Sequence, residues 1–569
     1  MRTVVAGRSG MARRSFMSRT SVDPILIIGA GPTGLTLAYE LQRRGVPCRV
    51  IDKRRGPATT SRSFTVHIRT LEGYDRAGIV PRLLELGIWS GGMVSHFRGE
   101  EERERLDFEQ LSMRFPGILL LEQDRLEGVL RDELASFAVL VEWDTELCSL
   151  TTDDDGHITG TVIHRDPDGR EIVETVRPSW LVGCDGVRST VRTLLGSGFD
   201  GSEYTGSMRM MDVPVYGLPP GDTDIRYDIH EDDMLLTVQL PKNYRVLISD
   251  TRPVERTKPD LEVAREEFQR VVDKHFGGGV RLGDPEWSTV FEIWRRMSTD
   301  YRVGNIFLCG DAAHVHSPAG GQGMNAAIQD AFNLGYKLAH VAAGVAPESL
   351  LDTYELERRP IAKQVIDGTH MLHSFMMAHG DSIASRRAIV RAPGFKQKAA
   401  AQIAGVSYNY RDDIAAPPVL APLDGLRAGD RAPDVAITPT LWLHDQLRHT
   451  GYTLLILQRE PSTLAASVAR TVQPYGERVR VVVITCPAVA AAAPPCAVIA
   501  ESDEVFDLYG TSTTDTLCVV RPDGYVGLRC HADDESALRA MLESVLSVPR
   551  TSEEVDTSAP LVAHGADGN

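Results

Sequence analysis

The fold of this chain is decided by the stretch ILIIGAGPTGLTLAYELQRRG, residues 25–45. Its first four residues form a short, continuous apolar run, which is typical of a buried strand. Three glycines follow with G-x-G-x-x-G spacing: Gly29, Gly31 and Gly34. In such a turn the first glycine permits a tight bend, the second lets the backbone approach a pyrophosphate, and the third lets the next helix pack on the strand. Because the amides at the start of that helix then face the phosphates, the stretch predicts a dinucleotide-binding unit.

The residues after this helix agree with that prediction. CRVID, residues 48–52, is expected to form a second strand, and it ends in Asp52. An acid about 20 residues beyond the glycines can accept hydrogen bonds from a ribose 2′-hydroxyl. The unit alone does not separate NAD from FAD. The chain has no second G-x-G-x-x-G that follows an apolar strand and opens a helix, which disfavours reductases and Baeyer–Villiger enzymes that hold a nicotinamide in a domain of its own.

Length, charge and cysteine usage narrow the class of protein. A chain of 569 residues predicts about two to four domains. Its formal charge of −17, from 61 basic and 78 acidic residues, argues against a general affinity for nucleic acid or anionic membranes. No apolar run reaches the roughly 18–20 residues that span a bilayer. The eight cysteines include no C-x-x-C pair, which favours reduced thiols and a cytoplasmic protein.

Four further segments carry a resemblance to a known family. They are SRSFTVHIRTLE (61–72), LEQDRLEGVLRDEL (121–134), WLVGCDGVRSTVRTLLG (180–196) and VGNIFLCGDAAHVHSPAGGQGMNAAIQDAFNLGYKLA (303–339). In this order, over roughly residues 23–405, the chain resembles the single-component FAD-dependent aromatic hydroxylases typified by p-hydroxybenzoate hydroxylase. Asp185 falls in a segment that looks like the family's DG motif, and Asp311 in one that looks like its GD motif.

The resemblance implies a flavoprotein monooxygenase. In that family NADPH or NADH reduces the FAD, and O₂ then adds to give a flavin C4a-hydroperoxide. The distal oxygen passes to an electron-rich ring, so the cofactor carries the difficult chemistry and no protein side chain is assigned as catalytic. The expected substrate is a phenol or a polycyclic aromatic natural product of secondary metabolism.

The residues expected to bind FAD come from the glycine turn and from these segments. Asp311 follows the apolar strand NIFLC, where its carboxylate can bind the hydroxyls of the ribityl chain. The turn ending at Gly323 lets the backbone approach a flat ring, and the helix starting at Met324 points its first amides at the edge where a reduced flavin is anionic. By resemblance, Arg62 contacts the diphosphate side and Gln123 the ribityl region. The full predicted set is Gly29, Gly31, Gly34, Asp52, Lys53, Arg62, Gln123, Asp185, Asp311, Pro318, Gly321, Gly323, Met324 and Asn325.

Residues 200–289 are expected to form an antiparallel sheet over the flavin, because polar and apolar residues alternate between turn signals. Its inner face would offer the substrate some of four candidates, Tyr227, His230, Gln239 and Arg245, although alternation does not say which residues face inward. His314 and His316 lack a carboxylate partner at suitable spacing, so no metal site is predicted there.

The C-terminal part resembles the thioredoxin-like domain of longer members of the same family. The stretch directly after its first core strand, QREPST (458–463), holds no cysteine, so thiol chemistry is not expected and the domain is a structural element or a contact in a possible homodimer. The predicted fold is therefore α/β, with a Rossmann-like FAD-binding domain, an inserted β-sheet domain and a thioredoxin-like domain. The expected boundaries are an N-terminal extension (1–22), the discontinuous FAD-binding domain (23–199 and 290–405), the substrate domain (200–289), a linker (406–430), the thioredoxin-like domain (431–549) and a disordered tail (550–569).

Several alternatives stay open at this point. An FAD-dependent dehydrogenase, or a ring-opening or N-hydroxylating oxygenase, would use the same fold. A non-catalytic flavin-binding assembly protein would use the C-terminal domain as its contact surface, although a ring face with helix donors is unneeded in a scaffold. The first twenty residues, rich in Arg and Ser, are either a disordered extension or a targeting segment.

Overall fold

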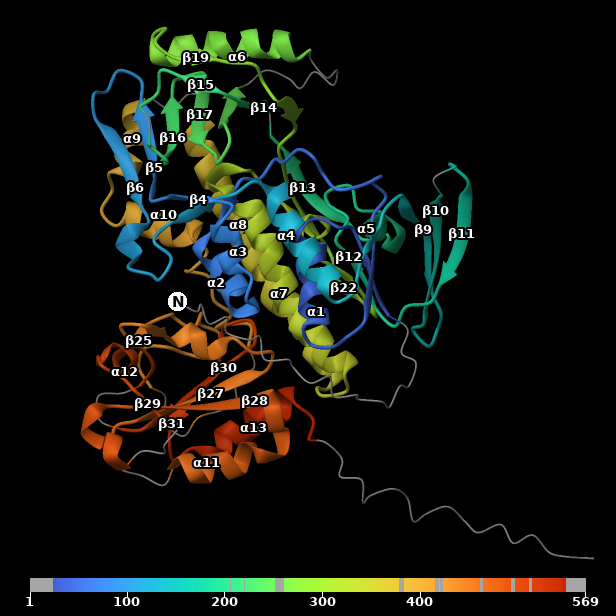
Figure 1. Ribbon diagram of the computed structural model, residues 1–569, viewed down its shortest axis with the longest axis vertical. Coiled ribbons are helices and arrows are strands. Elements are labelled where there is room, and N and C mark those ends of the chain that lie inside the picture. Colours follow the sequence, from blue (N-terminus) through green and yellow to red (C-terminus); the bar gives the residue numbers. More distant parts are fainter. Residues whose placement is uncertain are drawn as a thin grey trace, which may run out of the picture.

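The computed structural model describes residues 24–548, apart from 167, 205, 220, 251–259, 378–382, 415–418, 420–422, 461–463, 493–496 and 511–513. Figure 1 shows an elongated molecule with the C-terminal domain at one end and the substrate sheet at the other. The expected N-terminal extension and C-terminal tail lie outside the described residues. Among the residues that the structure describes, no helix combines the length and the apolar character needed to cross a membrane.

A six-stranded sheet in the order β22-β23-β12-β1-β2-β8 forms the centre of the domain that is expected to bind FAD, called the FAD-binding domain below. Its parallel strands are β1 (Ile25–Ile28), β2 (Cys48–Ile51), β8 (Val141–Glu142), β12 (Leu181–Gly183) and β23 (Ile306–Leu308), and β22 (Arg302–Val303) pairs antiparallel at one edge. Helices α1 (Pro32–Gln42), α4 (Gln123–Ser136) and α7 (Gln322–Ala342) pack together beside it. The short apolar strands are buried on both faces, as expected for a parallel sheet covered by helices.

The domain that is expected to bind the substrate, called the substrate domain below, is a seven-stranded sheet in the order β20-β14-β18-β17-β16-β5-β6. Its strands are β5 (Gly92–Phe97), β6 (Arg103–Asp107), β14 (Ser207–Val213), β16 (Ile225–Ile229), β17 (Asp233–Gln239), β18 (Tyr244–Asp250) and β20 (Trp287–Phe291). The expected range 200–289 is therefore incomplete. β5 pairs parallel with β16, so residues 92–107 join this sheet instead of the FAD-binding domain. That pairing joins segments more than 100 residues apart, which local sequence patterns do not report.

The two faces of this sheet pack against different partners. Even-numbered residues of β17, such as Leu236, belong to the cluster that faces the FAD-binding domain, together with Val390 and Ile403. Odd-numbered residues, such as Leu235, pack against Phe268 of helix α6 (Leu261–Phe276). This period of two follows from the pleat of a strand, and Figure 1 shows α6 lying across the outer end of the sheet.

Further helices and a small sheet complete this part of the molecule. They are α2 (Ile68–Ala77), α3 (Val80–Leu84), α5 (Thr190–Leu195), α8 (Thr353–Met377), α9 (Ile383–Val390), α10 (Phe395–Ile403) and the protruding sheet of β9 (Thr145–Thr152), β10 (Ile158–Arg165) and β11 (Glu171–Val176). Short strands complete the connections: β3 (Thr65–Val66), β4 (Ile88–Ser90), β7 (Ile118–Leu120), β13 (Phe199–Glu203), β15 (Val215–Tyr216), β19 (Arg281–Leu282), β21 (Trp294–Ser298) and β24 (His314–Val315).

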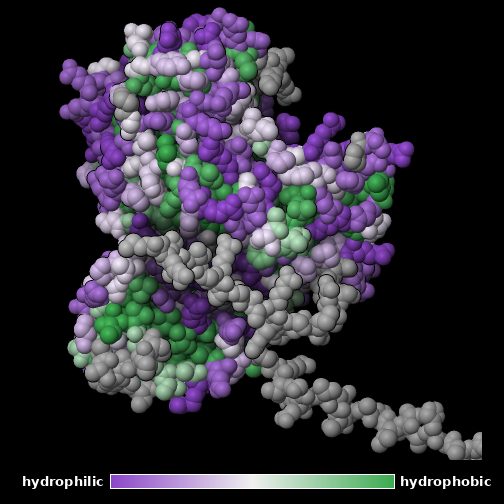
Figure 2. All heavy atoms as spheres, viewed as in Figure 1, coloured by the Kyte–Doolittle hydropathy of each residue, from purple (hydrophilic) through white to green (hydrophobic). Residues whose placement is uncertain are grey.

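The C-terminal domain has a five-stranded sheet in the order β29-β28-β27-β30-β31. Strands β27 (Tyr452–Gln458), β28 (Val479–Thr485) and β29 (Val498–Ile499) are parallel, whereas β30 (Thr516–Val520) and β31 (Val526–His531) form an antiparallel hairpin. Helices α11 (Leu464–Val472), α12 (Glu504–Tyr509) and α13 (Glu535–Val545) accompany the sheet. Figure 2 shows that hydrophobic residues gather more on this domain's visible face than on that of the other two domains.

The segment expected to be a linker is packed at some of its described positions. Tyr410 is buried and its ring lies 4.1 Å from that of Tyr525 in the β30–β31 hairpin. Its hydroxyl also accepts a hydrogen bond from Arg358 of α8 at 3.1 Å. The C-terminal domain is thus fixed to the FAD-binding domain through residues that the sequence pattern assigned to a loose connection.

Candidate active site

Two adjoining cavities follow the carboxyl ends of the central parallel strands. The smaller, of about 230 Å³, is lined by Gly29, Gly31, Asp52 and Gln123 among others. The larger, of about 500 Å³, shares Gly31 and Gln123 and extends to the inner face of the substrate sheet. Ligands in open α/β folds bind at this edge of the sheet. Of the predicted cofactor residues, all except Gly34 and Asn325 line one of the two cavities.

The glycine turn has a separate steric reason for each glycine. Gly29 has a φ of +105°, and a Cβ there would lie 2.4 Å from the carbonyl oxygen of Cys184. A Cβ on Gly34 would lie 2.0 Å from the carbonyl oxygen of Gly29, so only glycine lets α1 pack this closely. A Cβ on Gly31 would meet no atom within 4 Å, and Gly31 lines both cavities at the N-terminus of α1. The open position is the one that a pyrophosphate needs.

Asp52 lies at the floor of the smaller cavity and is oriented by the backbone. Its Oδ2 accepts a hydrogen bond from the Ala30 amide at 2.8 Å, and its Oδ1 accepts one from the Arg54 amide at 2.8 Å. The Arg54 side chain also donates to both carboxylate oxygens, at 3.0 Å each. A ribose hydroxyl must therefore share Asp52 with Arg54, a residue that the sequence reasoning did not select.

Asp185 and Gln123 are placed by the first turns of two helices. Asp185 accepts hydrogen bonds from the Ser189 hydroxyl at 2.5 Å and the Thr190 amide at 2.6 Å, where α5 begins. Burial raises its pKa despite these bonds. Gln123 opens α4, and its side-chain amide donates to Glu127 at 2.9 Å. Both side chains border the smaller cavity.

Asp311 projects into the larger cavity from a turn that the neighbouring helix supports. Among the described residues, no other side chain or backbone group forms a hydrogen bond or ion pair with its carboxylate, and desolvation by the surrounding protein raises its pKa. The turn is held from behind by Asp330 of α7, which accepts hydrogen bonds from the Gly310 amide at 3.1 Å and from His314 at 2.7 Å. Arg358 pairs with the other oxygen of Asp330 at 2.7 Å. Asp330 is fully buried and is a positioning residue that sequence reasoning missed.

The N-terminus of α7 meets the same cavity. Gly321 has a φ of +66°, and a Cβ there would lie 2.6 Å from the Thr65 hydroxyl. Asn325 is buried and lies outside the cavity lining. Its side chain accepts from the His67 amide at 2.8 Å and donates to the Thr65 and Gly321 carbonyl oxygens at 2.9 and 3.0 Å. Asn325 therefore fixes the loop against the helix, while Gly323 and Met324 face the space beyond its first turn.

The structure separates the four substrate candidates. Tyr227 lines the larger cavity, and burial raises its pKa. His230, Gln239 and Arg245 are absent from the lining, which corrects the expectation for these three. His230 follows the end of β16 in the turn to β17, and Gln239 lies on the face of β17 opposite Leu236. Arg245 is buried in an ion pair with Asp212 at 2.6 Å.

The sheet contributes other side chains that alternation alone could not select. They share an apolar character and face the larger cavity: Met93, Met210, Ile225, Leu236, Leu247 and Phe291. His316 and Phe64 also border this space. A period-two pattern in each strand was visible in the sequence, but the register between strands determines which face is turned inward.

Family models match both parts of the chain. A model described as an FAD binding domain matches residues 23–369, and one described as aromatic-ring hydroxylase, C-terminal, matches residues 426–549. Pentachlorophenol 4-monooxygenase of Sphingobium chlorophenolicum is 43% identical over 437 residues, which cover 76% of this chain and 79% of that protein. A flavin-dependent monooxygenase of Mycobacteroides abscessus is 34% identical over 89% of this chain and 96% of its own.

Solved structures agree with these matches. The anhydrotetracycline hydroxylase OxyS of Streptomyces rimosus superposes with a TM-score of 0.72 at 27% identity, covering 92% of this chain and 99% of that one. A ternary complex of aklavinone-11 hydroxylase with FAD and aklavinone gives a TM-score of 0.71 at 26% identity, with 93% and 99% coverage. The family models, the relatives and the cofactor-sized cavities lead to one conclusion: the chain belongs to the FAD-binding aromatic-ring hydroxylases, and it is an FAD-dependent monooxygenase of aromatic compounds.

Proposed function

We propose that this monooxygenase hydroxylates an apolar phenol that carries no carboxylate. The observation behind the proposal is the wall that the substrate sheet turns to the larger cavity. Its side chains are Met93, Met210, Ile225, Tyr227, Leu236, Leu247 and Phe291. Binding an ionised carboxylate against such a wall would cost several kcal/mol, on the order of the penalty for burying an unpaired charge.

The cations of the cavity support the same proposal. Arg54 is engaged by Asp52, and Arg62 lies over the Phe291 ring with its guanidinium carbon 5.5 Å from the ring centroid. Both belong to the loop that follows β2, beside the glycine turn. We assign Arg54 to the ribose side of the cofactor, Arg62 to its diphosphate, and the sheet wall to the substrate. In that wall, the hydroxyl group of Tyr227 can form a hydrogen bond with a phenol.

The chain's own residues fit a bound FAD. Gly31 leaves room for the pyrophosphate, Asp52 and Arg54 border the ribose side, and the Asp311 carboxylate is open to the hydroxyls of the ribityl chain. When bound, the flavin supplies the reaction with O₂, with NADPH or NADH as electron donor. The first turn of α7 would offer amide donors to the pyrimidine side of a bound flavin, and the apolar wall would exclude water from the aromatic substrate.

A substrate panel tests the proposal. We expect chlorinated and alkylated phenols to accelerate NAD(P)H oxidation and to yield products heavier by one oxygen atom. Hydroxybenzoates of the same ring size should bind weakly and give little product. Mass spectrometry of the products, with peroxide measured alongside, distinguishes hydroxylation from wasted reduction of O₂. A strong preference for hydroxybenzoates would overturn the assignment of the wall.

Three other expectations remain proposals. The strand order of the C-terminal domain, with parallel β27 and β28 followed by the antiparallel β30–β31 hairpin, supports a thioredoxin-like assignment. Association into a homodimer is tested by light scattering of the FAD-loaded protein. A cytoplasmic location is tested by fractionation of cells that produce the full chain.

A further inference from the structure

A group of potential metal ligands lies on the substrate domain, outside the cavity lining. His230 stands in the turn after β16, Asp233 opens β17, and His275 lies in the last turn of α6. One ligand atom from each residue comes within 4.8 Å of the others. Among the described residues, no other three histidine, cysteine or acidic side chains bring their possible ligand atoms this close together. Figure 1 shows these elements at the end of the molecule away from the C-terminal domain.

The distances are close to those of a zinc site. His275 Nε2 lies 3.0 Å from Asp233 Oδ1, and His230 Nδ1 lies 3.9 Å from the same oxygen. Zn–N and Zn–O bonds of about 2.0–2.2 Å place the ligands of a tetrahedral ion roughly 3.3 Å apart. The two observed separations lie on either side of that value. The two imidazole rings now stack with centroids 3.7 Å apart, so His230 must turn out of the stack to direct Nδ1 at an ion.

The burial of these nitrogens is the second observation. The side chain of His275 is fully buried and that of His230 is 8% exposed. Nδ1 of each ring is buried without a hydrogen-bond partner among the described residues. Desolvated ring nitrogens without partners cost stability. A metal ion would bind Nδ1 of His230 directly, whereas the hydrogen bond between His275 and Asp233 leaves that nitrogen without a partner.

The charges around the group determine which oxygen is free for an ion. Lys274 pairs with Asp233 Oδ2 at 2.7 Å and holds the carboxylate in place, which leaves Oδ1 toward the histidines. Arg98 is the other nearby cation acting on His230. The turn between His230 and Asp233 adds the exposed carboxylates of Glu231 and Asp232, which offset these positive charges.

We propose that His230, Asp233 and His275 bind one Zn²⁺ ion, with water as the fourth ligand. Two imidazoles and one carboxylate form a ligand set that zinc accepts in proteins. The ion would join the turn between β16 and β17 to the C-terminal end of α6. It would thereby hold the outer helix against the sheet whose other face lines the active-site cavity. Its role is structural, because none of the three residues lines that cavity.

The test measures zinc uptake by the tag-free, FAD-loaded full chain after chelator treatment. Equilibrium dialysis against micromolar zinc chloride, followed by elemental analysis, should find about one zinc per chain. Asp233→Asn and His230→Gln should each lower the zinc affinity at least about tenfold, since even outer partners of a metal ligand are worth that much. The matched control is His157→Gln, because His157 and Asp153 form an exposed pair at 3.2 Å with no second histidine.

A spectroscopic measurement distinguishes this site from adventitious surface binding. Cobalt(II) in place of zinc should give the visible absorption of a tetrahedral ion in the unaltered protein and in His157→Gln, and not in Asp233→Asn. Zinc should also raise the melting temperature of only those two proteins. Equal zinc uptake by the unaltered protein and both site variants would overturn the proposal, as would a cobalt spectrum without tetrahedral bands. His230→Gln leaves the helix residue in place and keeps the test valid if Asp233→Asn does not fold.

Discussion

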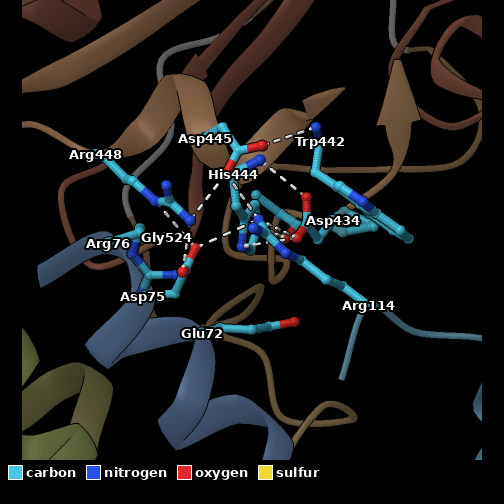
Figure 3. Close-up of polar contacts among 12 residues, drawn as sticks. Glu72, Asp75, Arg76, Arg114, Asp434, Trp442, His444, Asp445, Arg448 and Gly524 are labelled. Atoms are coloured by element: carbon cyan, nitrogen blue, oxygen red, sulfur yellow. Dashed lines mark hydrogen bonds and ion pairs between the residues drawn. The ribbon is translucent and has the colours of Figure 1, made fainter. Parts of the chain in front are cut away.

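Charged side chains differ in their partners between the active-site cavity and the interface with the C-terminal domain. In the cavity, the side chains of Arg62 and Asp311 form no hydrogen bond or ion pair with another described residue, and both border open space. At the interface, acidic side chains and arginines from the two domains form ion pairs across the boundary (Figure 3). Arg448 pairs with Asp75 at 2.7 Å, and Arg114 with Asp445 at 2.9 Å. Charged side chains without a protein partner are available to bind a ligand, whereas paired charged side chains at the interface hold the two domains together.

The interface continues into a fully buried network. Arg521 of the C-terminal domain donates to both carboxylate oxygens of Glu357 at 2.8 and 2.7 Å and pairs with Asp523 at 2.6 Å. Lys337 also pairs with Glu357, at 2.7 Å. Arg431 pairs with Glu72 on α2. Such networks are strongly destabilised when one member is lost, because the remaining charge stays buried without its partner.

The largest effect should follow from breaking this network. Arg521→Met should lower the free energy of unfolding by about 3–5 kcal/mol, since it leaves Glu357 and Asp523 with too little positive charge. Urea unfolding followed by circular dichroism measures this change. Arg82→Met is the matched control: Arg82 also pairs with two acids, Asp132 and Glu133, but is 41% exposed, so the loss should stay within about 1 kcal/mol. Equal losses in the two variants would contradict the structural role of the interface.

The next effect should be confined to the cavity. Gly31→Val would project a branched side chain into the space at the N-terminus of α1 and weaken FAD binding about 100-fold, which corresponds to about 2.7 kcal/mol. Flavin fluorescence during titration of the apoprotein measures the affinity. Gly279→Val adds the same side chain where a Cβ likewise meets nothing within 4 Å, far from the cavity lining, and should leave it unchanged. If Gly31→Val bound FAD normally, the pyrophosphate would lie elsewhere.

A pH-dependent effect is expected at the interface. Burial, reinforced by Glu72, raises the pKa of Asp434 to about 7. Because the folded pKa lies above the unfolded one, the folded protein holds the proton more tightly, and stability from this group is lost as pH rises from about 4 to about 7. The stability advantage of Asp434→Asn over the unaltered protein should therefore be larger at pH 8 than at pH 5, by about 1–3 kcal/mol. Thermal unfolding at both pH values measures the gain.

The control for this pH effect is an exposed acid. Asp132→Asn changes a side chain that is 68% exposed and should show the same stability difference from the unaltered protein at both pH values. A gain for Asp434→Asn that is larger at pH 5 than at pH 8 would reverse the sign and place the charged form of Asp434 in the folded protein.

The smallest effect should come from the substrate wall. Tyr227→Phe removes one hydroxyl from an otherwise apolar surface and should raise KM for a phenol by up to about tenfold, the equivalent of roughly 0.5–1.5 kcal/mol for one hydrogen bond. Steady-state kinetics with product analysis measures the change. Tyr216→Phe alters an exposed tyrosine of β15 and should have no effect. A much larger loss for Tyr227→Phe would mean that the hydroxyl acts on the reacting atoms instead of contributing to binding.

The sequence by itself determined the nucleotide unit, the α/β class and the family. The glycine turn, the acid directly after β2 and the GD segment are local patterns. Each can be recognised from a few neighbouring residues. The need for glycine at position 34 follows from such a local contact, with the carbonyl oxygen of Gly29, whereas Gly29 itself must also make room for the distant Cys184. FAD and the monooxygenase activity were likewise predictable, because the motifs that carry them are short and ordered along the chain.

Only the tertiary structure decided which side chains meet across elements. The pairing of β5 with β16 brought residues 92–97 into the substrate sheet, and strand register turned Tyr227 inward while His230 and Gln239 point elsewhere. The support of the Asp311 turn by Asp330 and the burial of Tyr410 in the interface also depend on contacts between distant segments. Local propensity and alternation fix an element and its two faces, but the choice between those faces is made by long-range packing.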